Sequence, residues 1–319
     1  MLFLSKEDIK NVIDFKEMVE VIEKSMLIYE EGNYVMPDRI SVLNEDETYL
    51  YMPCFCGDIK GTKFLTLYPE NRKHGEAVIQ GVMVMNSPKT GKVDCVMDGA
   101  AITSFRTGAV GAMGIKYTTP ESVETLGVIG TGVQGFSQCL YACTMRNIKK
   151  IHVFDIAKER AEKFKKDLED ELKNVEVVVC ENTEDLVKKS ELIITVTTSP
   201  KPVMPDDVEL FKGKHFIGIG SYKPHMREYP KAIFENLKSV YIDVEFAKEE
   251  TGDLATPLKE GWIKDEQIHS IGKLIKDKSI LEEETTFFKS VGMALFDTTI
   301  ANYVLRKAKE KKIGKEVKF

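Results

Sequence analysis

The sequence predicts an α/β protein with two domains. One domain is expected to hold a parallel sheet covered by helices, and the other to be of the α+β type with an antiparallel sheet. Two observations lead to this prediction. The chain has 319 residues, which exceeds the roughly 250–300 residues at which a single hydrophobic core stops growing. The apolar pattern also changes after Pro120, from short runs separated by turns to strands that alternate with helices.

The first 118 residues are expected to form the α+β domain. An amphipathic helix is predicted over residues 15–31, because apolar positions recur at helical spacing and Gly32 follows them. Residues 99–117 are apolar around most of a helix's circumference, which predicts a buried helix. Turn residues separate several β-like runs between these helices, and this favours an antiparallel sheet. The runs cover residues 48–54, 63–67, 77–86 and 93–97.

After Pro120, near-continuous apolar strands alternate with helical patterns, which is typical of a parallel sheet buried on both faces. A last amphipathic helix is expected after Val291-Gly292. Strands are predicted over residues 125–130, 150–155, 175–180, 192–197, 215–220 and 239–243, and helices over residues 133–146, 157–171 and 183–189.

Composition and charge exclude several classes of protein. The formal net charge is −6, from 45 Lys and Arg against 51 Asp and Glu, so we expect no nucleic-acid partner. No apolar run approaches the ~18 residues of a membrane span, and charges interrupt the start of the chain where a signal peptide would be apolar. The six cysteines form no CxxC pair and have no histidine at zinc-ligand spacing. We therefore expect reduced thiols, a cytoplasmic protein and no metal.

The strongest motif is a glycine-rich turn between the apolar run TLGVI and a predicted helix: Gly130-Thr131-Gly132-Val133-Gln134-Gly135. The first glycine permits a tight turn, the second lets the backbone approach a pyrophosphate, and the third lets the helix pack close to the strand. The start of the helix adds N–H groups and the positive end of a helix dipole. The sequence therefore predicts a Rossmann-type domain that binds a dinucleotide.

Asp155 follows Gly135 by twenty residues and ends the next predicted strand. A carboxylate at this place accepts hydrogen bonds from the ribose hydroxyls and repels a 2′-phosphate, which favours NAD(H) over NADP(H). The alternative role for Asp155 is to cap the following helix. Lys158 and Arg160 leave the coenzyme choice open, because a nearby cation can hold a 2′-phosphate.

Three cations of the first domain have unusual surroundings. Arg106 interrupts the apolar helix 99–117 and has no acidic residue three or four positions away, so a partner from elsewhere or an anionic ligand is implied. Lys63 lies within a strand-like run, and Arg39 follows an extended turn. Taken singly, Lys63 and Arg39 are explained more simply as structural ion pairs or surface cations, whereas Arg106 indicates a function.

Short motifs spread over almost the whole chain carry a resemblance to a known family. They are Pro37-Asp38-Arg39, Lys63 with Pro69-Glu70-Asn71, Asp98-Gly99 leading to Phe105-Arg106-Thr107, the glycine turn, Thr195-Val196-Thr197-Thr198, and Lys289-Ser290-Val291-Gly292. Together they are similar to the motifs of the ornithine cyclodeaminase/mu-crystallin family.

The resemblance implies a discontinuous substrate-binding and dimerisation domain, residues 1–118 and 293–319, with the dinucleotide-binding domain, residues 119–292, inserted into it. It implies a homodimer. It also implies that three cations hold the carboxylate of a small amino or imino acid, and that Val291 touches this substrate. These cations are Arg39, Lys63 and Arg106. The residues expected to line the dinucleotide are Gly130, Gly132, Val133, Gln134, Gly135, Asp155, Thr107, Thr195, Ser221 and Ser290.

One departure from the family pattern concerns the reaction. Cyclodeaminases carry an aspartate that serves as a base after the fifth strand of the cofactor domain, and Tyr222 occupies its place here. The resemblance is therefore closer to the family's ketimine reductases and alanine dehydrogenases. We expect an NAD(H)-dependent oxidoreductase that acts at the α-carbon of an imino or amino acid, with Lys63 or Tyr222 as the proton donor. Two alternatives stay open: a cyclodeaminase that recycles NAD, and a non-catalytic ligand-binding protein.

Overall fold

The computed structural model describes residues 1–318, apart from the side chain of Arg72. These residues divide into two compact units. Unit 1 comprises Met1–Arg106 and the described residues from Met293 onward, and unit 2 comprises Thr107–Gly292. The first boundary therefore lies at residues 106–107, within helix α3 (Gly99–Thr118), and not at residue 118 as expected. The reason is close packing, because a Cβ atom added at Gly114 would lie 2.2 Å from the ring of Phe288 in unit 2.

Unit 1 is built on a sheet with the strand order β15-β1-β6-β5-β4-β3-β2. The strands β2 to β6 pair in antiparallel fashion, as expected, but β1 pairs with β6 in parallel, so the sheet is mixed. The strands are β1 (Leu2–Leu4), β2 (Ile40–Asn44), β3 (Glu47–Cys56), β4 (Ile59–Leu67), β5 (Ile79–Asn86), β6 (Val93–Asp98) and β15 (Lys315–Glu316); the helices are α1 (Lys6–Val12), α2 (Phe15–Glu31), η1 (Pro69–His74), the first part of α3, and α11 (Ala294–Lys311).

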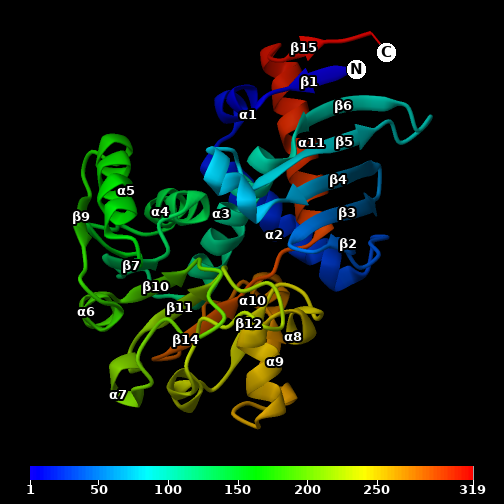
Figure 1. Ribbon diagram of the computed structural model, residues 1–319. Helices are drawn as coiled ribbons and strands as arrows, with labels where there is room; N and C mark the ends of the chain where they lie inside the picture. The colour runs from blue at the N-terminus through cyan, green and yellow to red at the C-terminus, as the bar shows by residue number, and fades with distance from the viewer. Residues whose placement is uncertain (319) are drawn as a thin grey trace. The chain divides into compact units, whose positions relative to one another are not determined.

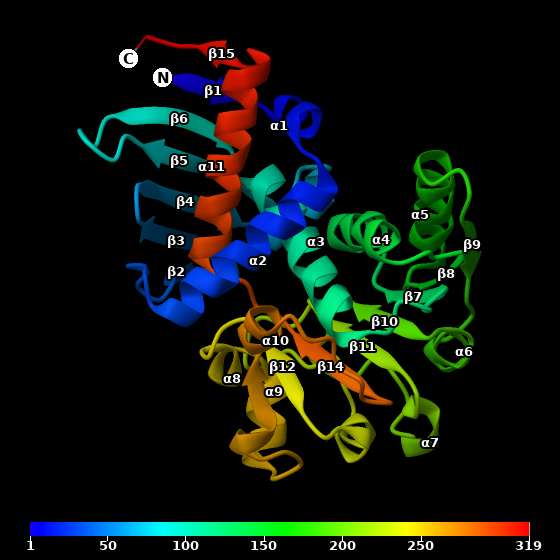
Figure 2. The ribbon, with the colours of Figure 1, turned by 180° about the vertical axis from the view of Figure 1, so that it is seen from behind.

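Helix α11 packs on β3, β4 and β5, and α2 packs on α11, so one face of this sheet is covered (Figure 2). Helix α2 has the predicted bounds: Asp14 caps its first turn, and Gly32 ends it in the left-handed region with φ 70°. Alternate side chains of β4 are buried, beginning with Gly61 and Lys63. Lys63 therefore lies on the covered face, in the core of the unit.

Unit 2 is built on a parallel sheet with the strand order β13-β12-β14-β11-β10-β7-β8-β9. The predicted Rossmann-type α/β fold is confirmed. The strands are β7 (Thr125–Ile129), β8 (Lys150–Phe154), β9 (Glu176–Val179), β10 (Leu192–Thr195), β11 (His215–Gly218), β12 (Val240–Ile242), β13 (Ile268–Ser270) and β14 (Thr286–Lys289), of which the last two were not predicted. The helices are α4 (Val133–Met145), α5 (Lys158–Glu171), α6 (Thr183–Lys189), α7 (Val208–Phe211), η2 (Lys231–Asn236), α8 (Ala247–Glu250), α9 (Gly252–Lys259), η3 (Asp265–Gln267) and α10 (Gly272–Asp277).

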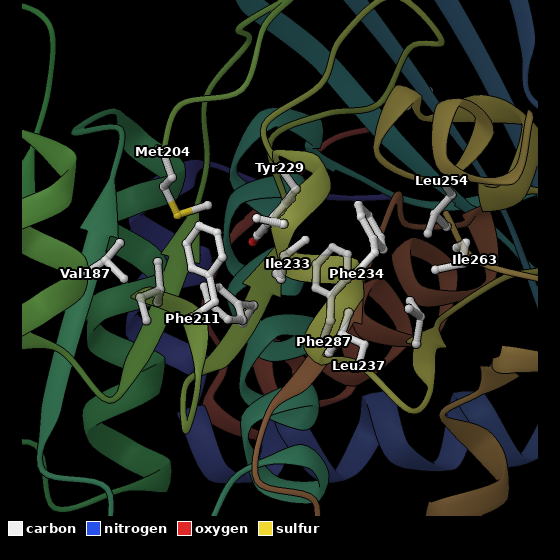
Figure 3. Packing of buried hydrophobic residues seen from close by; sticks show 14 of the residues in the cluster. Val187, Met204, Phe211, Tyr229, Ile233, Phe234, Leu237, Leu254, Ile263 and Phe287 are labelled. Atoms are coloured by element: carbon white, nitrogen blue, oxygen red, sulfur yellow. The ribbon is translucent and has the colours of Figure 1, made fainter. Parts of the chain in front are cut away.

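One core of unit 2 contains a group of aromatic side chains among its aliphatic residues, where β11 and β14 meet the segment around η2 (Figure 3). The rings of Tyr229 and Phe287 lie 4.4 Å apart, and Phe216 contacts both Phe211 and Tyr229 edge to face. This packing holds β11 and β14, which are neighbours in the sheet (Figure 1), against the segment around η2. Ligands of parallel α/β sheets bind at the carboxyl ends of the strands. Within residues 1–318, no helix has both the length and the apolarity that a membrane span requires.

Candidate active site

Unit 1 contains a buried cluster of charged groups, drawn from three elements. Asp297, in the first turn of α11, lies between Lys63 of β4 and Arg106 of α3. Its Oδ2 is 2.6 Å from the Nζ of Lys63, and its Oδ1 accepts a hydrogen bond of 2.8 Å from the Nε of Arg106. One carboxylate faces two cations, so the cluster carries a net positive charge away from water. Buried charge of this kind is costly unless a ligand or partner neutralises it.

The partner that the sequence implied for Arg106 is therefore Asp297, which is 191 positions away along the chain. The ion pair occupies only the Nε of the guanidinium. Among the described residues, its two terminal nitrogens have no hydrogen-bond partner. A guanidinium held at Nε keeps a pair of N–H donors in the planar arrangement that matches a carboxylate.

Asp297 was not identified from the sequence, although a signal was present. It interrupts an apolar stretch of α11, between Phe296 and Ile300, in the same way that Arg106 interrupts α3. A charged residue inside an apolar helix face needs a partner wherever it occurs. The pairing of Arg106 with Asp297 could be recognised only from the fold, because nothing in the sequence indicates that the two side chains meet.

The surroundings of Lys63 lower its pKa to about 7. Burial is the largest cause, the charges of Arg106 and Arg39 act in the same direction, and Asp297 opposes the decrease. Arg39, which lies just before β2 and is half-buried, is thus close enough to act on Lys63. The structure brings Lys63 and Arg106 together around Asp297, and the charge of Arg39 acts on Lys63 from nearby.

Unit 2 contains the predicted glycine turn, and its geometry fits a dinucleotide. A Cβ atom at Gly135 would lie 2.3 Å from the carbonyl oxygen of Gly130, so α4 packs directly on the turn. Gly130 adopts φ 107°, which favours glycine. At Gly132 a Cβ atom would meet no atom within 4 Å, and no side chain caps the start of α4 at this residue. The backbone here is open to a pyrophosphate, as the motif requires.

Two apolar side chains next to this turn are strongly exposed. Val133 is 70% exposed and Ile156 is 92% exposed. Large apolar residues gathered on the surface indicate a surface that a ligand covers. Ile156 directly follows Asp155 in the sequence and was not singled out there. Gln134 also lies at the start of α4, and its Oε1 is buried and has no partner among the described residues.

Asp155 directly follows β8 and holds the glycine turn in place. Its Oδ2 accepts hydrogen bonds from the backbone N–H and the hydroxyl of Thr131, at 3.0 and 2.8 Å, and its Oδ1 accepts from the N–H of Ala157. Arg160 also donates to Oδ1, at 2.6 Å. Burial alone would raise the pKa of Asp155, but these hydrogen bonds outweigh it and lower the pKa below its usual range. Asp155 is therefore a firmly ionised carboxylate beside the turn.

The other expected cofactor contacts lie at the carboxyl ends of the parallel strands or on α3, and several are occupied by protein. The hydroxyl of Thr195 donates to Tyr229, that of Ser221 to the carbonyl of Met226, and that of Ser290 to Asp243. Thr107 accepts a hydrogen bond from Gln138 through its carbonyl oxygen.

Tyr222 and Val291, the two expected substrate contacts of unit 2, differ in burial. Tyr222 is half-buried, and the Nζ of Lys223 lies 5.9 Å from its ring centre. The backbone N–H of Val291 donates to Asp243 at 3.3 Å, and the side chain is buried.

A second buried charged cluster, which the sequence analysis did not identify, lies in unit 2. The Nζ of Lys289 is 3.1 Å from the Oδ2 of Asp253, and Glu228 lies beside them. The Oε1 of Glu228 accepts from the N–H of Thr197 after β10, and its Oε2 accepts from the N–H of Ser221 after β11. Burial raises the pKa of Glu228 to about 6, against the opposing effect of Lys289. Glu228 thus ties together two loops at the ligand-binding edge of the sheet.

Known proteins share this architecture over its full length. A model of the ornithine cyclodeaminase/mu-crystallin family matches residues 1–312. The chain belongs to this family. The resemblance seen in the sequence motifs is confirmed.

The similar members of the family include reductases and a dehydrogenase. The chain is 30% identical to Delta(1)-pyrroline-2-carboxylate reductase of Bacillus cereus, and the match covers 100% of both chains. A solved structure of Delta(1)-pyrroline-2-carboxylate reductase of Thermococcus litoralis, in complex with NADH and L-proline, matches with a TM-score of 0.93 and 31% identity, over 99% of this chain and 100% of the other. An archaeal alanine dehydrogenase dimer with bound NAD matches with a TM-score of 0.90 and 29% identity, over 100% of this chain and 99% of the other. The expected class of function, NAD(H)-linked oxidoreduction of an imino or amino acid, agrees with the activities named for these relatives.

Proposed function

We propose that this family member is an NAD(H)-dependent reductase of a small cyclic imino acid, of the pyrroline- or piperideine-2-carboxylate type. Amino acid oxidation is the reverse reaction. The observation that carries the proposal is the Lys63–Asp297–Arg106 cluster, because it is buried, has a surplus positive charge and retains N–H donors for a carboxylate. The names of the relatives support the same reaction class.

In this proposal, unit 1 fixes the acid and supplies a proton. Arg106 binds the carboxylate of the substrate through its terminal nitrogens, and Arg39 adds positive charge. Lys63 donates a proton to the imine nitrogen, since its pKa of about 7 lets it hold and release one at neutral pH. Tyr222 is the alternative donor, and Val291 is proposed to contact the substrate. A fixed carboxylate also limits the positions of the α-carbon, which lowers the entropic part of the barrier.

Unit 2 is proposed to bind the dinucleotide. Gly130, Gly132 and Gly135 form the turn for the pyrophosphate, with Val133 and Gln134 beside it. When bound, the reduced dinucleotide supplies a hydride to the α-carbon. We further propose Thr107, Thr195, Ser221 and Ser290 as contacts of its nicotinamide half, since the last three follow strands at the ligand-binding edge.

NADH is proposed as the preferred coenzyme over NADPH. Asp155 is ionised and beside the glycine turn, where a carboxylate repels a 2′-phosphate. Arg160, one of the two cations that left the choice open, donates to Asp155 and is thereby partly neutralised. Michaelis constants measured for both coenzymes test this point, and similar values would remove the preference.

A direct assay tests the reaction. NADH consumption is followed with the cyclic imines, with 2-oxo acids plus ammonia, and with ornithine. We expect consumption with a cyclic imine that carries a 2-carboxylate, and no ammonia release from ornithine, because Tyr222 stands where a cyclodeaminase has its basic aspartate. Ammonia release from ornithine without net NADH consumption would overturn the proposal, and so would tight ligand binding without any turnover.

We propose a homodimer that forms through the uncovered face of the unit 1 sheet. Tyr51, Phe64 and Val82 are directly paired across β3, β4 and β5, and by strand alternation they share the face opposite to the buried Lys63 and to α11. Phe55, on the same face of β3, is 49% exposed. A continuous apolar row of this kind is typical of a protein interface, and a related alanine dehydrogenase is described as a dimer. In sedimentation experiments Phe55→Glu should shift the protein toward monomer, whereas Ile280→Glu, a matched exposed site in unit 2, should not.

The six cysteines are free, which suits a reducing compartment. We therefore propose a cytoplasmic location.

A further inference from the structure

Asp297 holds an unusual place for a carboxylate. Asp297 is completely buried, and each of its carboxylate oxygens pairs with one cation. Oδ2 pairs with Lys63, and Oδ1 pairs with Arg106. These cations come from β4 and α3, so one side chain joins a strand and two helices. A buried ion pair by itself is weak evidence of stabilisation, because desolvation offsets the attraction. A role in orienting and charging the two cations explains the arrangement better.

The geometry determines how Arg106 is presented. Binding at Nε fixes the plane of the guanidinium and leaves its terminal N–H groups unspent among the described residues. If a carboxylate of the protein bound the terminal N–H groups of Arg106 in place of its Nε, it would compete with the substrate for them. Asp297 therefore orients Arg106 without occupying the donors that recognise an anion.

The charges around Lys63 determine its protonation. The groups that act on it are Asp297 from α11, Arg106 from α3 and Arg39 from the segment before β2. The Cys54 thiol on β3 lies near Asp297 and stays neutral, because burial raises its pKa to about 12. Burial and both arginines lower the pKa of Lys63, whereas Asp297 raises it. Asp297 is therefore the group that favours the protonated form of Lys63. Burial would raise the pKa of Asp297 itself, but Arg106 and Lys63 outweigh that effect and lower it.

We propose that Asp297 is a positioning residue for imine reduction: it keeps the Lys63 ammonium charged and holds Arg106 by Nε, so that proton donor and carboxylate fork act on one substrate. This inference rests on the proposed function. The imine nitrogen takes a proton from Lys63, the nitrogen–carbon double bond becomes a single bond, and the α-carbon takes the hydride described above. Lys63 is left as a neutral amine, which regains its proton from water.

Asp297→Asn tests the proposal, because it removes the negative charge and keeps the shape. The descending limb of kcat/KM for imine reduction, expected near pH 7 in the wild type, should move at least one pH unit toward acid. Activity at pH 7 should then fall about tenfold or more, since few molecules retain the proton. Asp297→Glu should restore the limb toward its original position. Glu310→Gln, an exposed site on the same helix, is the control and should leave the profile unchanged.

A second readout does not depend on turnover. The side chain of Lys63 is titrated by NMR in lysine-labelled protein without dinucleotide, and its signal is assigned by its absence in Lys63→Met. The midpoint should be lower in Asp297→Asn than in the wild type, and Asp297→Ser, which also removes the charge, provides the same comparison if the asparagine variant does not fold. Equal midpoints, or equal pH profiles in an active enzyme, would overturn the role of Asp297. A wild type that reduces no imine would instead refute the proposed function, even if the midpoint shifts.

Discussion

The two buried charged clusters of this protein have opposite compositions. In unit 1, one carboxylate faces two cations: Asp297 with Lys63 and Arg106. In unit 2, two carboxylates share one nearby cation: Glu228 and Asp253 with Lys289. Backbone N–H groups stabilise the two carboxylates of the second cluster.

The N–H groups of Thr197 and Ser221 bind Glu228, and those of Glu228 and Tyr229 bind Asp253. In the first cluster the terminal nitrogens of Arg106 have no such partner within the described chain. The difference teaches that burial of charge alone does not mark a binding site. A guanidinium whose terminal N–H groups remain available for an anion does mark one. Carboxylates bound by backbone N–H groups stabilise loops instead, although the Nζ of Lys289 and the Oδ2 of Asp253 have no hydrogen-bond partner among the described residues.

The largest expected effect comes from Arg106→Ala. Loss of the guanidinium should lower kcat/KM for a cyclic imino acid by about 10³-fold or more, which corresponds to roughly 4 kcal/mol of lost transition-state binding. NADH binding, measured by fluorescence titration, should be nearly unchanged. Arg306→Ala, which removes an exposed arginine paired with Glu310, should leave both quantities unchanged. Retained activity in Arg106→Ala would break the assignment of unit 1 as the anion site.

Replacing each cluster's lysine by methionine compares the two regions directly. Lys289→Met leaves Asp253 and Glu228 without their cation and should lower the free energy of unfolding by about 3–5 kcal/mol. Lys63→Met leaves Asp297 paired with Arg106 and should change it by only about 1 kcal/mol, while imine reduction is lost. Urea denaturation at a fixed protein concentration measures both. Equal destabilisation by the two variants would contradict the distinction.

Glu228→Gln sharpens the comparison at smaller cost. One carboxylate oxygen becomes an NH₂ group that faces the N–H of Thr197 or Ser221, which should cost about 1–3 kcal/mol of stability. The pKa of Glu228 is raised to about 6 in the folded protein, so the folded state holds its proton more tightly than the unfolded state. The stability that this group contributes is therefore present below its ordinary pKa and is lost as pH rises through about 6. Because glutamine does not titrate, the gap between wild type and variant should be larger at about pH 5 than at about pH 7.5; a constant gap would argue against this assignment.

The smallest effect is expected for coenzyme choice. Arg160→Ala removes the cation that binds Asp155 and should lower the residual affinity for NADPH by a few-fold, with little change for NADH. Michaelis constants for the two coenzymes measure it. An equal loss of affinity for NADH and NADPH would mean that Arg160 acts by stabilising the conformation of the glycine turn.

The sequence by itself determined the parts of this protein that depend on local patterns. The bounds of α2 follow from Asp14 and Gly32, the parallel sheet from apolar strands alternating with helices, and the dinucleotide turn from Gly130, Gly132 and Gly135. Each of these needs only residues close together in the chain. Short strands without a strong pattern, such as β1 and β14, were missed because their pairing partners lie far away in sequence.

Tertiary structure alone decided which charges meet. Arg106 was recognisable as a cation without a local partner, but that its partner is Asp297, and that Lys63 shares it, follows from the packing of α11 on β4 within unit 1. The same holds for Glu228, whose partners are backbone N–H groups of two loops. Hydrogen bonds and ion pairs act over a few ångströms, so their partners are set by which distant segments the hydrophobic core brings into contact.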